Sequence, residues 1–162
     1  MSTRFMQPGA MQIRPVRDDD AAGISPLLAD LGYPSDESAV RVRLANLERA
    51  GGYACMVAED GNGIVGVVAL ALGWFLEMDG PYVRVVALVV RENTRGQGVG
   101  GALMAEAERW AVAQGSSVLM LNSGTQRTEA HAFYTRRGFA NTGLRFVKQI
   151  GTQSGTQGGT ST

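Results

Sequence analysis

The spacing of apolar and polar residues changes twice in the middle of this chain, and each change marks the boundary of a predicted element. Residues 83–90, V-R-V-V-A-L-V-V, are too rich in valine for a helix and have the length of a mostly buried strand. From Ala102 to Gln114, apolar residues recur at helical spacing instead. A glycine-rich run, Arg95–Gly101, separates the two. The pattern therefore predicts a strand, a glycine-rich turn and a helix in succession.

The residues before this turn predict a strand and two helices. A short strand is expected at residues 12–16. The acids of residues 18–20 suit a helix start, and this helix either kinks at Pro26 or begins at Ser25. A second helix is expected to be capped by Ser35 and to turn three apolar residues inward, namely Val40, Leu44 and Leu47.

Residues 53–59 and 64–72 are predicted strands joined by the sequence D-G-N-G, which strongly favours a hairpin. With the strand at residues 83–90 they predict an antiparallel meander that leads into the glycine-rich turn. Gly115 ends the following helix, and residues 117–122 form the next strand. Because a helix connects these two strands, they should run parallel to each other.

Residues 126–137 are predicted to form the last helix, with Ala130, Phe133 and Tyr134 facing inward, and residues 144–150 a final strand. Residues 1–10 are expected to be a flexible N-terminus. Residues 151–162, built of Gly, Thr, Gln and Ser, are expected to be a disordered tail. Residues 11–150 then make a single domain, which suits the length of the chain.

A glycine turn between a strand and a helix is suited to binding phosphate. Unpaired backbone N–H groups and the positive end of the helix dipole meet there, and the missing Cβ atoms let a ligand approach. A dinucleotide-binding turn should follow its strand directly, with an acid about 20 residues later. Here Arg91–Arg95 intervenes, and residues 119–122, L-M-L-N, hold no acid. A Walker loop would need Lys and then Ser or Thr, where this chain has Ala102 and Leu103.

Two motifs resemble those of the GNAT acyltransferase superfamily. Arg95-x-x-Gly98-x-Gly100 resembles its pyrophosphate-binding signature, and residues 130–139, A-H-A-F-Y-T-R-R-G-F, look like its closing helix. The motifs lie in the family's order, so the resemblance covers roughly residues 12–150. It implies an α/β (α+β) fold with a mixed, mostly antiparallel sheet of about six to seven strands flanked by about four helices. Residues 127–148 look most like the small-amine acetylating branch, which includes aminoalkylphosphonate and aminoglycoside N-acetyltransferases.

The resemblance also implies a donor substrate, acetyl-CoA, and the residues that hold it. In the family the glycine turn binds the pyrophosphate, and the backbone of the preceding strand pairs with the pantetheine arm. An amide near Leu88 would also polarise the thioester carbonyl, and Asn122 is expected to hydrogen-bond the arm. The residues expected to bind the coenzyme are Leu88, Val89, Val90, Arg95, Gly96, Gln97, Gly98, Val99, Gly100, Gly101 and Asn122.

Tyr134 is the expected proton donor to the departing thiolate, because a phenol with a pKa of about 10 is protonated at neutral pH. The general base stays open. Many relatives carry a glutamate on the strand before the turn, where this chain has Arg84, Val86 and Ala87. Glu77, Asp79 or a water chain could deprotonate the amine instead, and the lone His131 is a weaker candidate for a proton shuttle. Three aromatic residues are expected to wall the acceptor pocket, namely Tyr33, Trp74 and Phe75.

Composition narrows the class of protein. Fifteen basic residues balance fifteen acidic ones, so no charge excess favours a nucleic-acid or membrane surface. The single Cys55 excludes an internal disulfide and, with no long apolar run, favours a cytoplasmic protein. No metal site is predicted, and pairing into a homodimer through an edge strand such as residues 144–150 is compatible with the sequence. The resemblance to the GNAT superfamily implies an N-acetyltransferase acting on the primary amine of a small molecule. The alternatives are an acyl-CoA-binding sensor and, least favoured, a Rossmann-type nucleotide-binding domain.

Overall fold

The computed structural model describes residues 10–151. These residues belong to two compact units that divide between Ser123 and Gly124. The flexible N-terminus and the disordered tail predicted from the sequence lie outside the described residues, except for Ala10 and Gly151. Among the described residues, no helix is both long enough and apolar enough to cross a membrane.

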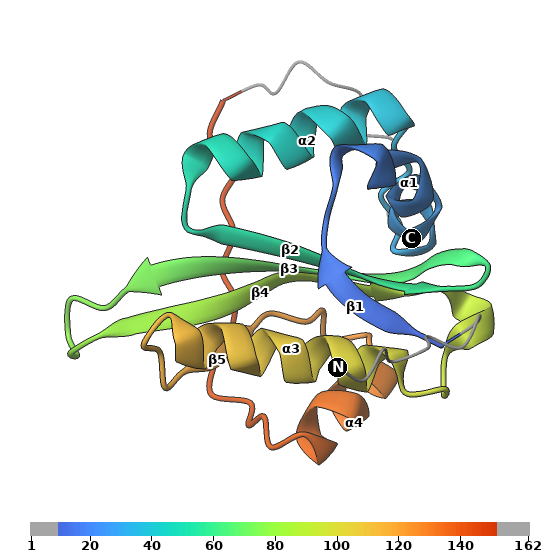
Figure 1. Cartoon of the computed structure of the whole chain (residues 1–162). Helices are drawn as coiled ribbons and strands as arrows, with labels where there is room; N and C mark the ends of the chain where they lie inside the picture. The colour runs from blue at the N-terminus through green and yellow to red at the C-terminus, as the bar shows by residue number, and fades with distance from the viewer. Residues whose placement is uncertain (1–9, 152–162) are drawn as a thin grey trace, which may run out of the picture. The chain divides into compact units, whose positions relative to one another are not determined.

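The first unit is built on a five-stranded sheet in the order β1-β2-β3-β4-β5, with β1 to β4 antiparallel and β5 parallel to β4 (Figure 1). The predicted fold class is confirmed, a mixed and mostly antiparallel sheet with four α-helices in the described residues, although the sheet has fewer strands than expected. The strands are β1 (Gln12–Pro15), β2 (Tyr53–Asp60), β3 (Gly63–Trp74), β4 (Pro81–Val90) and β5 (Leu119–Leu121). The helices are α1 (Ala21–Asp30), α2 (Glu37–Ala50), α3 (Val99–Ala113) and, in the second unit, α4 (Thr128–Arg136), with short 3-10 helices η1 (Asp18–Asp20) and η2 (Glu92–Thr94).

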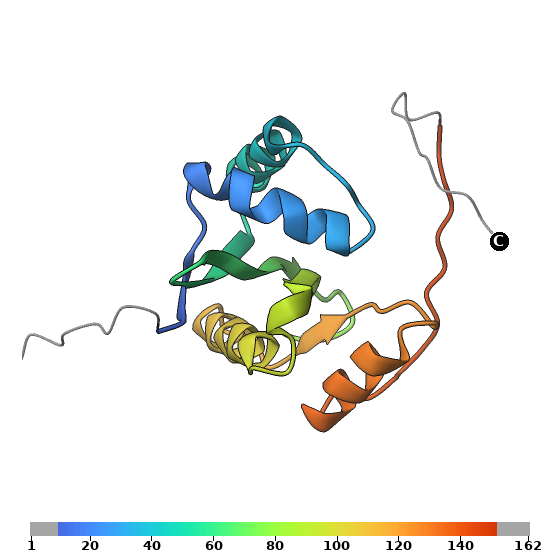
Figure 2. The ribbon, with the colours of Figure 1, turned by 90° about the vertical axis from the view of Figure 1, so that its right-hand side faces the viewer.

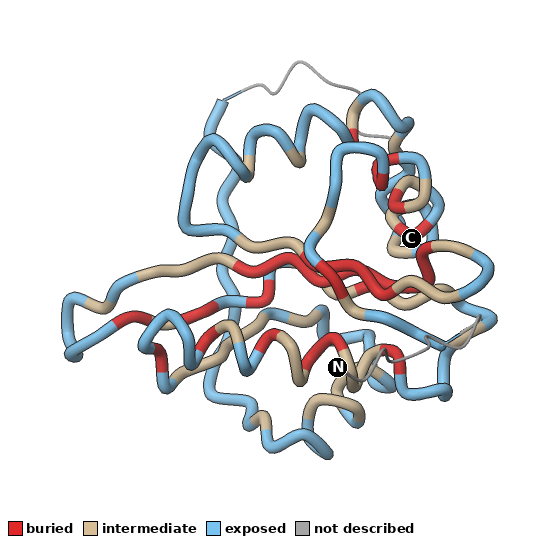
Figure 3. The backbone as a smooth tube through the Cα atoms, viewed as in Figure 1, coloured by how far each residue is buried: buried red, intermediate tan, exposed pale blue. Residues whose placement is uncertain are grey.

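Helices cover both faces of this sheet. In Figures 1 and 2, α1 and α2 lie on one face and α3 on the other. The α1–α2 side buries a core that includes Ile24, Leu27, Val57, Val67 and Val89. On the α3 side, Leu103 and Met104 are fully buried. Buried residues therefore run through the centre of the sheet and along the inner side of α3, while the outer surfaces of the helices stay exposed (Figure 3).

Two predicted helix starts differ in detail from the structure. Helix α1 runs from Ala21 straight through Pro26, so this proline does not mark its beginning. Helix α2 is capped by Asp36 rather than Ser35, because the Asp36 carboxylate accepts a hydrogen bond of 2.7 Å from the Ala39 N–H. Ser35 points its hydroxyl to the Tyr33 carbonyl instead. Both residue types favour caps, so backbone geometry decides between them.

The predicted strand at residues 144–150 is wrong. Residues 139–150 form neither helix nor strand, and four large apolar side chains are exposed, those of Leu144, Phe146, Val147 and Ile150. A strand forms only beside another strand, so its propensity alone cannot produce one. The loss of this strand accounts for the lower strand count.

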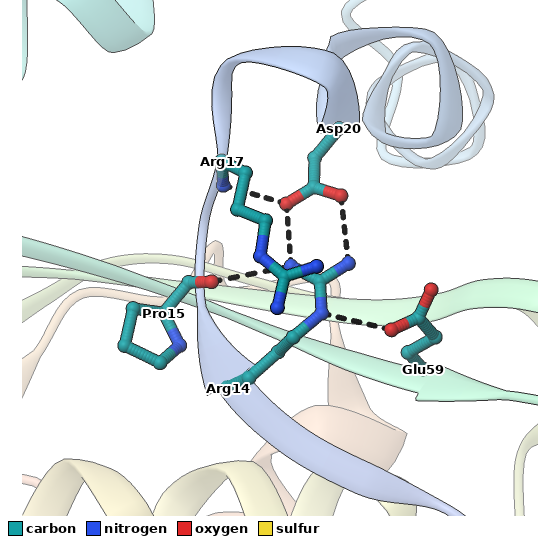
Figure 4. A network of polar contacts seen from close by, with 5 residues as sticks. All are labelled: Arg14, Pro15, Arg17, Asp20 and Glu59. Atoms are coloured by element: carbon teal, nitrogen blue, oxygen red, sulfur yellow. Dashed lines mark hydrogen bonds and ion pairs between the residues drawn. The ribbon is translucent and has the colours of Figure 1, made fainter.

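A buried ion pair joins β1, η1 and β2. The side chains of Arg14 and Asp20 are only 8% and 6% exposed. Arg14 Nη1 and Nη2 donate to the two carboxylate oxygens of Asp20 at 2.7 and 2.8 Å, and Arg14 Nε donates to Glu59 at 2.8 Å (Figure 4). The Arg17 N–H also donates to Asp20. Asp20 is thus a structural ligand of Arg14, beyond the helix-start role expected for the acids of residues 18–20.

We expect Asp20→Asn to lower the free energy of unfolding by about 3 kcal/mol at pH 7, because a buried Arg14 loses its bidentate partner while keeping Glu59. Hydrogen bonds from Arg14 hold the pKa of Asp20 below its usual value of 3.8. A lowered pKa means that this stabilisation is present above pH 3.8 and is lost as the pH falls through the folded-state pKa. The difference in unfolding free energy between the wild type and the variant should therefore become smaller below about pH 4.

Urea unfolding from pH 7 down to pH 3 measures this effect. The control is Asp19→Asn, which removes an exposed acid from the same η1 turn and should change stability by less than about 0.5 kcal/mol. Equal stability of the two variants would show that the Arg14–Asp20 pair contributes nothing beyond surface charge.

Candidate functional site

Strand β5 ends part-way along β4. Their parallel ladder contains only three pairs, which end at Val85↔Leu121. Strand β4 nevertheless continues to Val90, paired with β3 as far as Gly66↔Val90. From Val86 onward, the edge of β4 that faces β5 is therefore left without a ladder partner.

A β-bulge in β4 lies next to the last pair of the β4–β5 ladder. Ala69 pairs with Ala87 and Leu70 with Val85, so Val86 is an extra residue on β4. A bulge bends its strand and interrupts the alternation of side chains. Without the bulge, Val85 and Val89 would lie on the same face, because they are four residues apart. With it, Val85 pairs with Leu70 on one face, Val89 belongs to the α1–α2 core on the other, and both are buried.

The backbone of β4 after the bulge presents amides to this open edge. The Arg91 N–H donates to the Val65 carbonyl at 2.8 Å, so it points toward β3. Because N–H directions alternate along a strand, those of Leu88 and Val90 point away from β3. The backbone of Val89 points toward β3, and its side chain is 3% exposed in the core. Of the three predicted strand residues, Leu88 and Val90 thus offer the free hydrogen-bonding groups.

The glycine-rich turn follows directly. Gly96 and Gly98 have φ angles of +79° and +84°, which favour glycine, and a Cβ built on either would meet nothing within 4 Å. Gly98 is the N-cap of α3 and supplies no side chain to its N–H groups. The first intrahelical bond is donated by Ala102 to the Gly98 carbonyl, so the N–H groups of Val99, Gly100 and Gly101 precede it.

Gly66 positions this helix end beside the open edge of β4. A Cβ on Gly66 would lie 2.9 Å from Leu103 Cδ1 and 3.0 Å from Val99 Cγ1, so the glycine allows the first turns of α3 to pack closely on β3. Gly66 is also the register partner of Val90. The uncapped N-terminus of α3 and the free amides of β4 are therefore held near each other by one close contact. An isolated glycine in a valine-rich strand is the pattern that could have indicated it.

The end of β5 supplies two further polar groups. Asn122 directly follows the strand and is exposed, as a ligand-binding amide would be. The Ser123 hydroxyl oxygen is buried and has no hydrogen-bond partner among residues 10–151. A buried hydroxyl without a partner is costly unless a ligand or water satisfies it. Within this unit, the open strand edge, the glycine turn and this hydroxyl all fit a ligand with a hydrogen-bonding arm and phosphates.

The second unit holds Tyr134 on α4. Its ring contacts Phe133 and Phe139 edge-on, with centroid distances of 5.3 and 5.7 Å. Burial raises the pKa of the Tyr134 phenol, although the nearby Arg127 opposes the shift, so the hydroxyl stays protonated at neutral pH. His131 Nε2 lies 2.8 Å from the Gly124 carbonyl, which gives this histidine a structural partner within the same unit.

A family model now identifies the chain. The model described as the acetyltransferase (GNAT) family matches residues 24–139. The chain belongs to the GNAT acetyltransferase family. The match includes both the glycine-rich turn and the Tyr134 helix, so it covers both motifs that resemble the family.

Individual relatives agree with this assignment. The chain is 32% identical over 87 residues to an aminoalkylphosphonate N-acetyltransferase of Salmonella typhimurium, covering 54% of this chain and 56% of that protein. It spans about half the length of the curated relatives it matches. A GNAT family acetyltransferase of Staphylococcus aureus has a similar structure, with a TM-score of 0.74, 25% identity and coverage of 86% and 98%.

The structure of AAC(6')-Iy in complex with the bisubstrate analog CoA-S-monomethyl-acetylneamine shares the fold. Its TM-score is 0.75 at 18% identity, and the match covers 88% of this chain and 99% of that one. That neighbour holds a coenzyme A derivative on the same fold.

The GNAT site of this chain has no carboxylate on β4. Arg84 is exposed there, and the candidate bases Glu77 and Asp79 are exposed residues of the connection between β3 and β4. Within residues 10–151, no three or more His, Cys, Asp or Glu side chains are grouped to hold a metal. Of the expected aromatic walls, Phe75 packs on Tyr82, whereas Tyr33 and Trp74 are each 69% exposed. Tyr82 was not singled out from the sequence.

Proposed function

We propose that this protein is an N-acetyltransferase that moves the acetyl group of acetyl-CoA directly to the primary amine of a small molecule. The observation that carries the proposal is the meeting of two features in the first unit: the open edge of β4 after Val86 and the uncapped glycine N-terminus of α3. Membership of the GNAT family and a neighbour that holds a coenzyme A analogue support it.

The coenzyme would use the features of this site in order. Its pyrophosphate would accept hydrogen bonds from the N–H groups of Val99, Gly100 and Gly101, with the helix dipole and Arg95 adding positive potential. The N–H groups of Arg95 and Gln97 already donate to the Glu92 and Thr94 carbonyls. Its pantetheine arm would pair with Leu88 and Val90 as a substitute strand and could reach Asn122. The Leu88 N–H would donate to the thioester carbonyl and stabilise the oxyanion that forms there.

The transfer itself makes a C–N bond and breaks a C–S bond. The neutral amine attacks the thioester carbonyl carbon, and the nitrogen, now positively charged, releases one proton to water. The tetrahedral oxyanion then collapses to the amide and a thiolate. We propose that the Tyr134 phenol protonates the thiolate and regains its proton from water. The acceptor enters as an ammonium ion and must first lose a proton. Because β4 lacks a carboxylate, we propose that this proton leaves through Glu77, Asp79 or water.

The absence of that carboxylate favours one alternative, a sensor that binds acyl-CoA without turnover. To separate the two functions, the purified protein is given acetyl-CoA with a panel of small amines. Thiol release and the mass of the product are then measured, and thermal shifts with acetyl-CoA and NAD are recorded in parallel. We expect acetyl-CoA to stabilise the protein, NAD to leave it unchanged, and at least one amine to gain an acetyl group.

Coenzyme binding without any acetylated amine would support the sensor and refute the enzyme. Stabilisation by NAD but not by acetyl-CoA would refute both. The homodimer and the cytoplasmic location expected from the sequence stay predictions alongside this proposal.

A further inference from the structure

We propose that Arg84 binds an acidic group of the acceptor, so that the preferred substrate is an amine that also carries a phosphonate, phosphate or carboxylate. The inference rests on the proposed acetyl transfer and names its substrate class. It follows from the position, surroundings and free donors of Arg84, all within the first unit.

The register of the sheet fixes the face on which Arg84 lies. Strand β3 packs against α3 at Gly66, so every second residue from Gly66 to Leu72 faces α3. Val83 pairs with Leu72 and therefore faces α3 as well, and it is fully buried. Its neighbour Arg84 points to the other face, the one on which α1 and α2 lie.

Arg84 lies on a row of paired residues that crosses the sheet. The row contains Tyr53 on β2, Ala71 on β3, Arg84 on β4 and Met120 on β5, each the register partner of the next. Leu44 and Leu47 of α2 border Tyr53, which is still 43% exposed, and Arg84 is exposed, so α1 and α2 leave the Arg84 end of the row uncovered. The residues of β3 nearest to Arg84 on this face are small, namely Ala69, Ala71 and Gly73.

An aromatic pair borders this surface. Tyr82 precedes Arg84 by two residues and shares its face, and its ring lies across Gly73, where a Cβ would be 2.3 Å from Tyr82 Cζ. Phe75 packs against the same ring with centroids 4.8 Å apart. The ring is therefore fixed from two sides, as the wall of a binding surface needs to be.

The guanidinium of Arg84 is available to bind an anion. In the described part of the chain its guanidinium forms no hydrogen bond or ion pair, whereas Arg14, Arg41 and Arg109 each pair with a carboxylate. A guanidinium presents donors in a fork that matches two oxygens of a carboxylate or phosphonate. Arg84 precedes Leu88 by about 13 Å of strand at 3.3 Å per residue. If Arg84 bound the acidic group of a short acceptor, the amine at the acceptor's other end would point along β4 toward the thioester.

The test compares acidic and neutral amines of similar size. We expect kcat/KM for 2-aminoethylphosphonate or β-alanine to exceed kcat/KM for propylamine. Arg84→Gln should lower kcat/KM for the acidic amines about 10- to 100-fold, the usual effect of losing a hydrogen bond to a charged group. The KM for acetyl-CoA should not change. Arg84→Glu should reverse the preference toward 1,3-diaminopropane. The relative rates with phosphonate and carboxylate show which acid is favoured.

Arg109→Gln is the matched control, because it removes one exposed positive charge from α3, on the opposite face of the sheet. An equal loss in Arg109→Gln, or equal rates with acidic and neutral amines in wild type, would overturn the role of Arg84. If no amine is acetylated, the proposed enzyme fails, and calorimetry with the CoA-loaded protein decides this inference separately. Binding of 2-aminoethylphosphonate that Arg84→Gln abolishes supports the site, and binding that is absent or unchanged refutes it.

Discussion

Gly98→Val should abolish acetyl-CoA binding while the sheet stays folded. Gly98 has a φ of +84° and caps α3 with its backbone, so a valine either strains this conformation or rotates the N–H groups away from the pyrophosphate. Its β-branched side chain would also occupy the space that the phosphates need. No protein atom lies within 4 Å of the added Cβ, so the fold itself meets no clash.

The control for strain lies at the other end of the same helix. Gly115 has a φ of +79° and equally open surroundings, so Gly115→Val imposes a similar backbone strain without touching the turn. Calorimetric titration with acetyl-CoA and a melting curve are measured for both variants. We expect Gly115→Val to lose stability and keep its affinity, and Gly98→Val to lose its affinity. Normal binding by Gly98→Val would show that the turn does not hold the coenzyme.

The second large effect is expected for Tyr134→Phe. If the phenol protonates the thiolate, its removal takes away general-acid catalysis, which typically contributes about 10²–10⁴-fold. Water can replace part of this, so we expect kcat to fall by at least roughly tenfold. Burial raises the pKa of Tyr134, so the wild-type rate should not show loss of this acid until the pH exceeds about 10.

A purely structural Tyr134 gives a different result. Its ring would still pack on Phe133 and Phe139 as phenylalanine, so the change would cost less than about 1 kcal/mol of stability and leave kcat near normal. Thr135→Val is the control, because it removes an exposed hydroxyl from the neighbouring position of α4 and should change neither kcat nor stability much. In an enzyme shown to be active, an unchanged kcat in Tyr134→Phe would exclude the phenol from the reaction.

The sequence by itself determined the two motifs and every element except the expected strand at residues 144–150. A valine-rich strand, a glycine turn and an amphipathic helix are encoded by residues close together in the chain, and so are the hairpin of β2 and β3 and the parallel step to β5. The phosphate-binding role proposed for Gly96–Gly101 could be inferred from the sequence for the same reason. Its chemistry depends on the backbone of one turn and one helix end.

Only the tertiary structure decided which strands pair and where each ladder ends. The bulge at Val86 and the end of the β4–β5 ladder at Val85 depend on pairing with residues far away in the chain, as does the contact of Gly66 with α3. In the sequence, Asp20 is one of three acids at a predicted helix start, whereas the fold buries it beside Arg14. At residues 144–150 a favourable local pattern found no strand to pair with. Each of these outcomes depends on contacts between distant segments, which local propensity does not specify.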